Sequence, residues 1–243
     1  MKGLRKNFRH KATTALAILI GLALFSVLEP AALAKVLART FPPILWRVDT
    51  RQPVVALTFD DGPDPVYTPQ VLEILARHNA RATFFLVGEH ARRHPELVAA
   101  IRRAGHEVGN HTGTMHTTFF IGQARFEEDL LRAEAALGIG SSKPKFFRPA
   151  GGLIRPAQLR WAKRNGYTCV LGSAYAFDPY RPPAGYIRWV IGKSLKPGVI
   201  VVLHDSGGNR SNTVAALEAI LETGESQGLR WVTLSEMLAT AKN

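Results

Sequence analysis

Two adjacent carboxylates, Asp60 and Asp61, are the residues of this sequence whose types and spacing best suit chemistry. They follow a short apolar run, residues 54–57, and precede Gly62-Pro63, a dipeptide typical of turns. The run predicts a buried strand, and successive strand residues point to opposite faces. One carboxylate could therefore bind a metal while the other accepts a proton, as metal-assisted hydrolysis requires. The alternative is that the pair only caps a helix or forms a turn.

Two histidines further along the chain could complete a metal site with Asp61. His111 and His116 would add two imidazoles to one carboxylate, which leaves coordination positions open for water and substrate. Zinc is the default metal for such ligands, and Co²⁺ or Mn²⁺ are alternatives because imidazole also binds other transition metals.

His204 is a third histidine of interest because it follows a predicted strand, residues 199–203. A histidine held at such a position can act as a general acid near neutral pH. We interpret His78, His90 and His94 as ordinary surface or core residues.

Strand and helix signals alternate from residue 54 onward, and this alternation must position the polar residues. Predicted strands cover residues 54–57, 82–88, 107–109, 145–147, 168–172, 199–203 and 229–234. Helices begin near residue 67 and cover 95–104, 126–137, 156–165, 186–195 and 213–221. This order predicts an α/β fold with about seven parallel strands in a sheet or barrel.

The carboxyl end of a predicted strand is the position shared by six polar residues: Asp60, Asp61, His111, Arg148, Asp178 and His204. In βα barrels the active site is built at that end of the strands. The regular placement favours a functional site over an isolated turn or cap.

These residues resemble the motifs of the polysaccharide deacetylase family, the NodB-homology domain of carbohydrate esterase family 4. The resemblance covers residues 53–238 and rests on five segments: 58–63, 110–112 with His116, 148–152, 170–179 and 203–205. It implies a distorted (β/α) barrel with about seven parallel strands, in a single catalytic domain.

The resemblance also implies catalytic roles. Asp60 would be the general base, oriented by Arg148, which Asp178 would orient in turn. His204 would be the acid that protonates the leaving amine. Asp61 would be a metal ligand.

For the substrate, the resemblance implies roles for Pro149, Gly151 and Leu203. Gly151, beside Pro149, would offer its N–H to the oxyanion, and Leu203 would line a pocket for the acetyl methyl group. The family usually has tyrosine where this chain has Gly151, so an aromatic contact to the sugar is lost.

Two further departures from the family pattern concern the metal site and the fourth motif. Family histidines are spaced H-x-x-x-H, whereas His116 lies one residue further from His111. A bulge or loop is therefore needed to bring both rings to one ion. In residues 170–179 the family's tryptophans and first aspartate are replaced, so we expect a different substrate groove.

The implied function is metal-dependent removal of N-acetyl groups from a polysaccharide that contains N-acetylglucosamine, peptidoglycan-like or chitin-like. One alternative is an O-acetyl esterase acting on xylan-like polymers, since the same site can attack an ester. Another is a catalytically weak carbohydrate-binding relative. The Asp60-Asp61 pair and His204 argue against the last, because sugar binding needs neither a base nor an acid.

The N-terminus predicts a location outside the cytoplasm. Five basic residues among the first eleven precede an apolar stretch, residues 12–28, and Ala32-Leu33-Ala34 has the form of a cleavage site. We expect residues 1–34 to be a signal peptide or a membrane anchor and 35–52 to be a linker. The domain would then be periplasmic, in the cell envelope or secreted.

The formal net charge of +12 is spread along the chain. We predict no nucleic-acid partner, because neither a clustered basic face nor a nucleic-acid-binding motif is present. The single cysteine, Cys169, lies in an apolar run and is expected to be a buried, inert thiol.

Overall fold

The computed structural model describes residues 44–241. The predicted signal or anchor, residues 1–34, lies outside this range, as does the predicted linker up to residue 43. The rest of that linker is part of the fold, because Ile44–Leu45 form a strand and the Ile44 side chain is buried. Among the described residues, no helix has the length and apolarity that crossing a membrane requires.

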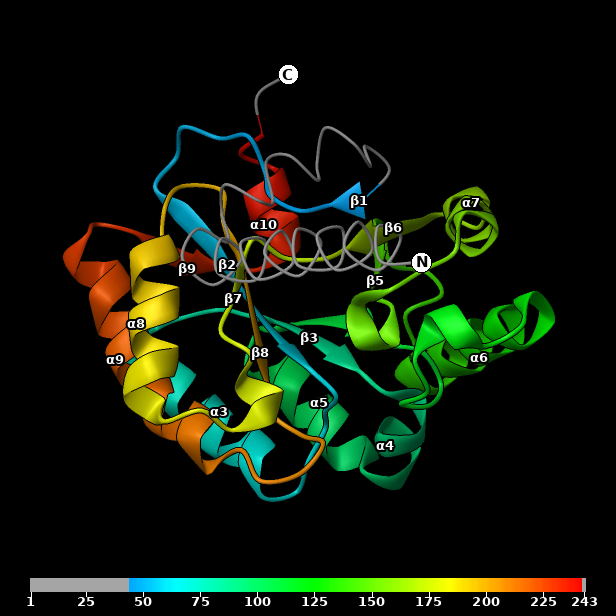
Figure 1. Ribbon diagram of the computed structural model, residues 1–243, viewed down its shortest axis with the longest axis horizontal. Coiled ribbons are helices and arrows are strands. Elements are labelled where there is room, and N and C mark those ends of the chain that lie inside the picture. Colours follow the sequence, from blue (N-terminus) through cyan, green and yellow to red (C-terminus); the bar gives the residue numbers. More distant parts are fainter. Residues whose placement is uncertain (1–43, 242–243) are drawn as a thin grey trace, which may run out of the picture.

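The strands form one nine-stranded sheet in which each strand pairing is parallel (Figure 1). Seven strands match the predicted ones: β2 (Val54–Asp60), β3 (Thr83–Leu86), β4 (Glu107–Asn110), β5 (Lys145–Phe147), β6 (Tyr167–Val170), β8 (Ile200–His204) and β9 (Arg230–Val232). The two others, β1 (Ile44–Leu45) and β7 (Ala174–Tyr175), are too short to give a periodic signal.

The strand order is β1-β6-β5-β4-β3-β2-β8-β7, and β9 pairs with the first residues of β2. Within residues 44–241 no pairing joins β1 to β7, so the curled sheet is open along one seam. The predicted single domain with a distorted (β/α) barrel is confirmed.

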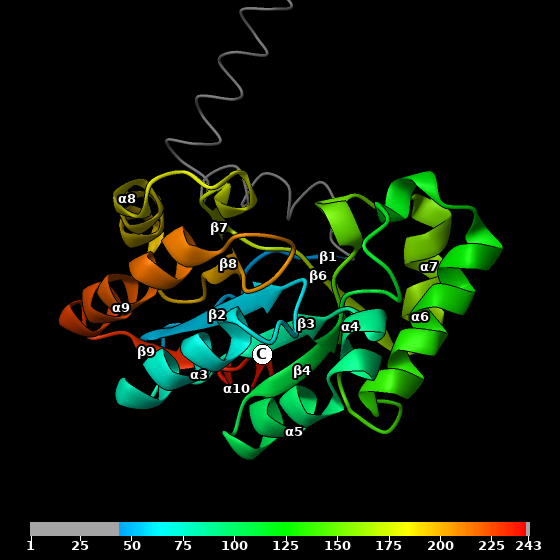
Figure 2. The same ribbon diagram turned by 90° about the horizontal axis from the view of Figure 1, so that it is seen from below.

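Helices surround the strands (Figure 1, Figure 2). On one side lie α3 (Tyr67–Arg77), α8 (Ala184–Ser194) and α9 (Ser211–Ser226), and on the other α4 (Gly88–Arg93), α5 (Pro95–Arg103), α6 (Gln123–Leu137) and α7 (Pro156–Arg164). A short helix, α10 (Leu234–Leu238), ends the domain. Three 3₁₀ turns lie in loops that follow strands: η1 (Thr118–Phe120), η2 (Ala150–Gly152) and η3 (Asp178–Tyr180).

The alternation of side chains along β2 separates two hydrophobic clusters. Val55, Leu57 and Phe59 belong to the cluster that contains helix residues such as those of α3 and α9. Val54 and Ala56 belong to a second cluster inside the barrel, which α10 also joins. Thr58 and Asp60 continue this inner face beyond Ala56, so β2 directs two polar side chains into the barrel at its carboxyl end.

Candidate active site

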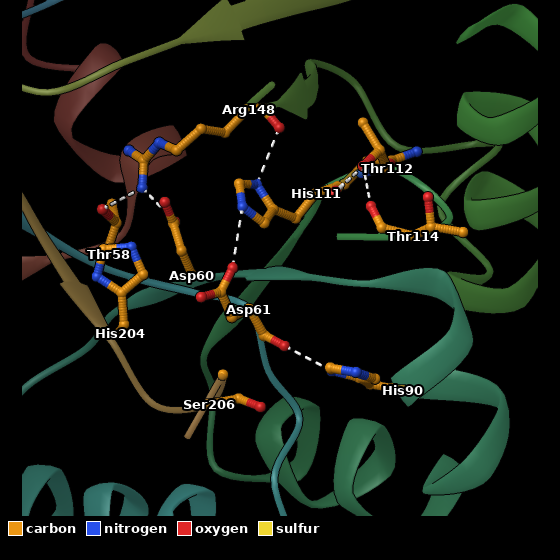
Figure 3. A network of polar contacts seen from close by, with 12 residues as sticks. Thr58, Asp60, Asp61, His90, His111, Thr112, Thr114, Arg148, His204 and Ser206 are labelled. Carbon is orange, nitrogen blue, oxygen red and sulfur yellow. Dashed lines mark hydrogen bonds and ion pairs between the residues drawn. The ribbon is translucent and has the colours of Figure 1, made fainter. Parts of the chain in front are cut away.

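The Asp60 carboxylate and the Arg148 guanidinium form a buried ion pair (Figure 3). Arg148 Nη1 donates to Oδ1 of Asp60 at 2.5 Å and to Oγ1 of Thr58 at 2.8 Å. Its Nε and Nη2 donate to the carbonyl oxygens of Val170 and Leu171, at 3.2 and 3.1 Å. Because every guanidinium nitrogen has an acceptor, Arg148 is fixed and holds the Asp60 carboxylate in one orientation.

Asp61 turns away from this pair and faces His111. Its backbone is in the left-handed region, with φ of 74°, and Oδ1 lies 3.3 Å from Nε2 of His111. The His111 Nδ1–H donates to the Arg148 carbonyl at 2.9 Å, so Nε2, which faces Asp61, is the nitrogen whose lone pair a bound metal would use. Metal-binding histidines commonly donate the N–H of their other ring nitrogen to a carbonyl oxygen in this way.

The surroundings of Asp61 favour its charged form. Burial by itself would raise the pKa of the Asp61 carboxyl, but the hydrogen bond and charge of His111, helped by His204 and Arg210, lower it below the ordinary value. The Asp61 carbonyl also accepts a hydrogen bond of 2.7 Å from Nδ1 of His90. Asp61 therefore presents an anionic carboxylate that is held through both its side chain and its backbone.

A second buried pair joins His204 and Asp178. The ring Nδ1 and the backbone N–H of His204 donate to the two carboxylate oxygens of Asp178, each at 2.9 Å, and Thr213 donates to the same carboxylate at 3.0 Å. Burial would lower the pKa of His204, but the charge and hydrogen bond of Asp178, with Asp60 and Asp61, raise it to about 9. The ring is thus a cation at neutral pH.

Strand register brings the two pairs together. β2 and β8 are adjacent and parallel, and Asp60 is the direct partner of His204. Residues paired in adjacent strands of a sheet point to the same face, so a carboxylate and a protonated imidazole meet at the mouth of the barrel.

His116 does not join this group. It is exposed, and its Nδ1 donates to Oγ1 of Thr114 at 2.9 Å, while Thr114 donates to Asp129 at 3.1 Å. No cluster of three or more potential ligands from histidine, cysteine, aspartate and glutamate occurs in residues 44–241. Asp61 and His111 are donors of the kind that fit a divalent metal ion, and they lie side by side. The expected third ligand, His116, does not lie with them.

Comparison with known proteins decides the family. The polysaccharide deacetylase model matches residues 47–170. A peptidoglycan-N-acetylglucosamine deacetylase of Bacillus cereus is 42% identical over 198 residues, which cover 80% of this chain and 92% of that protein. The chain belongs to the polysaccharide deacetylase family.

Two further matches agree with this membership. A chitooligosaccharide deacetylase of Sinorhizobium fredii is 34% identical, with 78% of this chain and 92% of that protein covered. The crystal structure of a peptidoglycan N-acetylglucosamine deacetylase bound to a benzamide compound superposes with a TM-score of 0.78 at 32% identity, covering 85% of this chain and 97% of that one.

Two positions inferred from the deacetylase family are placed differently. Asp178 binds His204 and not Arg148, whose guanidinium nitrogens are occupied by Asp60, Thr58 and two backbone carbonyls. Leu203 is fully buried in the cluster on the helix-facing side of the sheet. Side chains alternate along β8, so Leu203 points away from the face that carries His204 and does not line the site.

Steric crowding explains why glycine occupies position 151, where the family usually has tyrosine. Gly151 is exposed and has φ of 74°, and a Cβ atom there would lie 2.8 Å from Cγ2 of Thr117. Thr117, from the loop between β4 and α6, fills the space where a side chain at 151 would begin. Pro149 precedes this turn, and its carbonyl accepts the N–H of Gly152 at 2.9 Å.

The sequence motifs assign no role to three residues of the site, Thr58, His90 and Arg210. Thr58 shares the inner face of β2 with Asp60, which a strict period of two would have revealed. His90, for which the sequence predicts an ordinary surface or core role, donates a hydrogen bond to the backbone carbonyl of Asp61. Arg210 is buried, and its guanidinium donates to the carbonyls of Ser206, Gly207 and Pro179, thereby joining the loop after β8 to η3. No local sequence signal identifies contacts of this kind.

Proposed function

We propose that this chain removes N-acetyl groups from a polysaccharide containing N-acetylglucosamine, and that peptidoglycan is its substrate class. The observation that carries the proposal is the register of β2 and β8, which sets Asp60 beside His204. Hydrolysis of an amide needs a group that accepts a proton from water and another that protonates the departing nitrogen. The peptidoglycan-N-acetylglucosamine deacetylase of Bacillus cereus, 42% identical, supports the choice of substrate.

Asp60 is the proposed general base. Its carboxylate is fixed by Arg148, so the free oxygen keeps a constant direction toward the water that attacks the acetamide carbon. The same ion pair engages one oxygen of Asp60 and leaves the other for the water, which supports assigning metal binding to Asp61 instead. Asp60 and Asp61 therefore have different roles in the proposed reaction.

His204 is the proposed general acid. Its pKa, raised to about 9 despite burial, keeps Nε2 protonated at neutral pH. Asp178 holds Nδ1, so only Nε2 is available to donate a proton to the leaving amine. After transfer the neutral ring remains hydrogen-bonded to Asp178 in the same orientation.

Asp61 and His111 are the proposed ligands of a divalent metal ion, for which Zn²⁺ is the first choice and Co²⁺ or Mn²⁺ are alternatives. Such an ion would polarise the acetamide carbonyl and activate a water molecule. His111 is held for this role by the Arg148 carbonyl, and Asp61 by His90. His116 lies outside this pair, so its contribution to metal affinity should be smaller than that of His111.

Gly151 is the proposed oxyanion donor. Its turn lies directly after Arg148, and its left-handed backbone gives its N–H a direction that other residues adopt only with strain. A backbone N–H aimed at the developing negative charge would add to its stabilisation.

The proposed place of action is outside the cytoplasm. Residues 1–34 would direct export and either be removed or remain as an anchor through residues 12–28. Action on peptidoglycan, the polymer named in the Bacillus cereus relative, requires access to the cell wall.

The decisive experiment measures acetate released by the purified protein from N-acetylglucosamine oligomers and from O-acetylated xylan. We expect release from the amide substrate, loss of that release after chelation and recovery with Zn²⁺. Asp60→Asn should lower turnover by about 100-fold or more while bound metal stays unchanged, and His204→Ala should lower it by a similar factor.

Other outcomes identify the alternatives. Acetate from esters alone would favour an O-acetyl esterase. Binding of oligomers without release of acetate from either substrate would favour a carbohydrate-binding relative. Loss of metal from Asp60→Asn would show that the roles of Asp60 and Asp61 are assigned wrongly.

A further inference from the structure

Exposed apolar side chains gather around the mouth of the barrel. Large hydrophobic residues that are exposed between residues 44 and 241 are Val66, Met115, Phe119, Phe120, Leu131, Leu153, Tyr180 and Trp189. All but Leu131 and Trp189 lie in loops that connect the carboxyl end of a strand to the next helix, or at the end of such a loop. Exposed apolar side chains concentrated at one end of a molecule indicate a binding surface.

One loop, residues 111–122 between β4 and α6, carries three of these side chains and borders the site at two points. Near Asp61, a Cβ placed on Gly207 would lie 2.9 Å from Oδ2 of Asp61 and 3.2 Å from Cε of Met115. Met115 and Asp61 therefore flank the same small gap. Near Gly151, the neighbouring atoms belong to Thr117 of this loop. The loop forms a wall from the metal-ligand side to the proposed oxyanion donor.

The wall continues into an aromatic pair. Phe119 and Phe120 contact each other edge to face, with ring centroids 5.5 Å apart. The Arg155 guanidinium lies 5.4 Å from the Phe119 ring, which is 39% exposed, whereas 74% of Phe120 is exposed. Phe119 is thus supported on one side, and Phe120 presents its ring to solvent beside a site whose position 151 has no side chain.

We infer that Phe120, with Met115, is a specificity-determining surface that binds the sugars flanking the reacting N-acetylglucosamine of a polysaccharide strand. The inference rests on the proposed function and adds which residues contact the strand. One face of a pyranose ring presents C–H groups, and a flat exposed aromatic ring matches it at low cost in side-chain entropy. Continuity of the wall with Asp61 and Gly151 places such a contact next to the reacting sugar.

The test compares Phe120→Ala with a matched control, Trp189→Ala, which removes another exposed aromatic ring but from α8. kcat and KM are measured on the N-acetylglucosamine dimer and pentamer. We expect Phe120→Ala to lower kcat/KM on the pentamer by about tenfold, through KM, and on the dimer by a smaller factor; tenfold corresponds to about 1.4 kcal/mol. Phe120→Trp should restore the pentamer value, and Trp189→Ala should match the unaltered protein on both substrates.

A binding measurement keeps the inference testable if no deacetylation occurs. In the Asp60→Asn background, calorimetry of the pentamer should give a Kd about tenfold weaker when Phe120→Ala is added. Failure of the proposed function appears as absence of acetate release, whereas failure of this inference appears as unchanged pentamer binding.

Two other results would overturn the inference. Equal losses on dimer and pentamer would place Phe120 at the reacting sugar. A change in self-association by light scattering, with pentamer binding unaltered, would make the rings a contact between copies of the chain.

Discussion

The strand ends and the loop between β4 and α6 make different contributions to the site. Asp60 and His204 end adjacent strands, are buried, and are each hydrogen-bonded to an oppositely charged partner. His116 lies on the loop, is exposed, and is bonded to a neighbouring threonine. Asp60 and His204 meet as the sequence predicts, whereas His116 lies apart from Asp61 and His111.

The difference shows what each kind of support can do. The direction of a side chain on a strand is set by the strand register and by the alternation of faces. Once one side chain is known to point inward, the orientations of the others on that strand follow. A loop residue depends on each backbone torsion before it. In this loop Thr112 has φ of 72°, and one additional residue separates His116 from His111 relative to the family spacing. The same loop carries Met115 and Phe120, which makes it suited to substrate selection.

The largest effect is expected from breaking the buried pair on the strands. Arg148→Met leaves the Asp60 carboxylate buried without its cation, which should reduce the free energy of unfolding by about 3–5 kcal/mol. Urea denaturation followed by circular dichroism measures the loss. Arg160→Met, which alters an exposed arginine of α7, is the control and should change the free energy of unfolding by less than about 0.5 kcal/mol. A loss below 1 kcal/mol for Arg148→Met would contradict the rigid support described here.

A change in pH dependence is expected from Asp178→Asn. The raised pKa of His204 predicts that kcat falls as pH rises through about 9, when the proton is lost. Removing the Asp178 charge lowers that pKa, so the alkaline limb of the pH–rate profile should move from about 9 toward 6.5. The protonated ring also stabilises the folded state fully below pH 6.5, and this contribution is lost as pH rises to about 9. If the alkaline limb of the pH–rate profile stays in place, a group other than His204 is responsible for that limb.

Metal affinity should distinguish His111, the first residue after β4, from His116 further along the same loop. His111→Ala should weaken Zn²⁺ binding by roughly 10–100-fold or more, since loss of even an outer partner costs that much. His116→Ala should weaken it less, because that ring lies outside the Asp61–His111 pair. Calorimetric titration of the metal-free protein measures both. Equal losses would show that the loop moves inward when metal binds.

The smallest effect should come from Thr58→Val. The Thr58 hydroxyl accepts from Arg148 and donates to the Val201 carbonyl at 2.6 Å, so its removal leaves one buried carbonyl without this donor. We expect a loss of about 1 kcal/mol in unfolding free energy, because Arg148 keeps Asp60 and its backbone acceptors. Thermal unfolding should therefore shift by a few degrees, and a shift as large as that of Arg148→Met would make Thr58 an equal member of the pair.

Much of the fold follows from the sequence because long apolar runs have a clear period. Seven strands and the helices between them are predicted correctly, whereas α4, six residues with only Gly88 and Ala91 buried, has too little apolar periodicity to be recognised. β1 and β7 have two residues each and depend on the neighbouring strand to form.

The site is predictable where it depends on strand ends and less so where it depends on tertiary contacts. The convergence of Asp60 and His204 follows from parallel strands ending at one edge. The pairing of Asp178 with His204 joins residues 26 positions apart through η3, and no sequence pattern specifies it. The same holds for Leu203, whose orientation was inferred from the family and is reversed by strand alternation.

The open seam between β1 and β7 has a consequence for how the domain behaves at high protein concentration. Unpaired strand edges recruit strands of other molecules and start aggregation. In the described part of the chain, each strand at this seam has only two residues. An edge that short offers a neighbouring chain too few backbone groups to extend the sheet, so the barrel can stay open without promoting self-association.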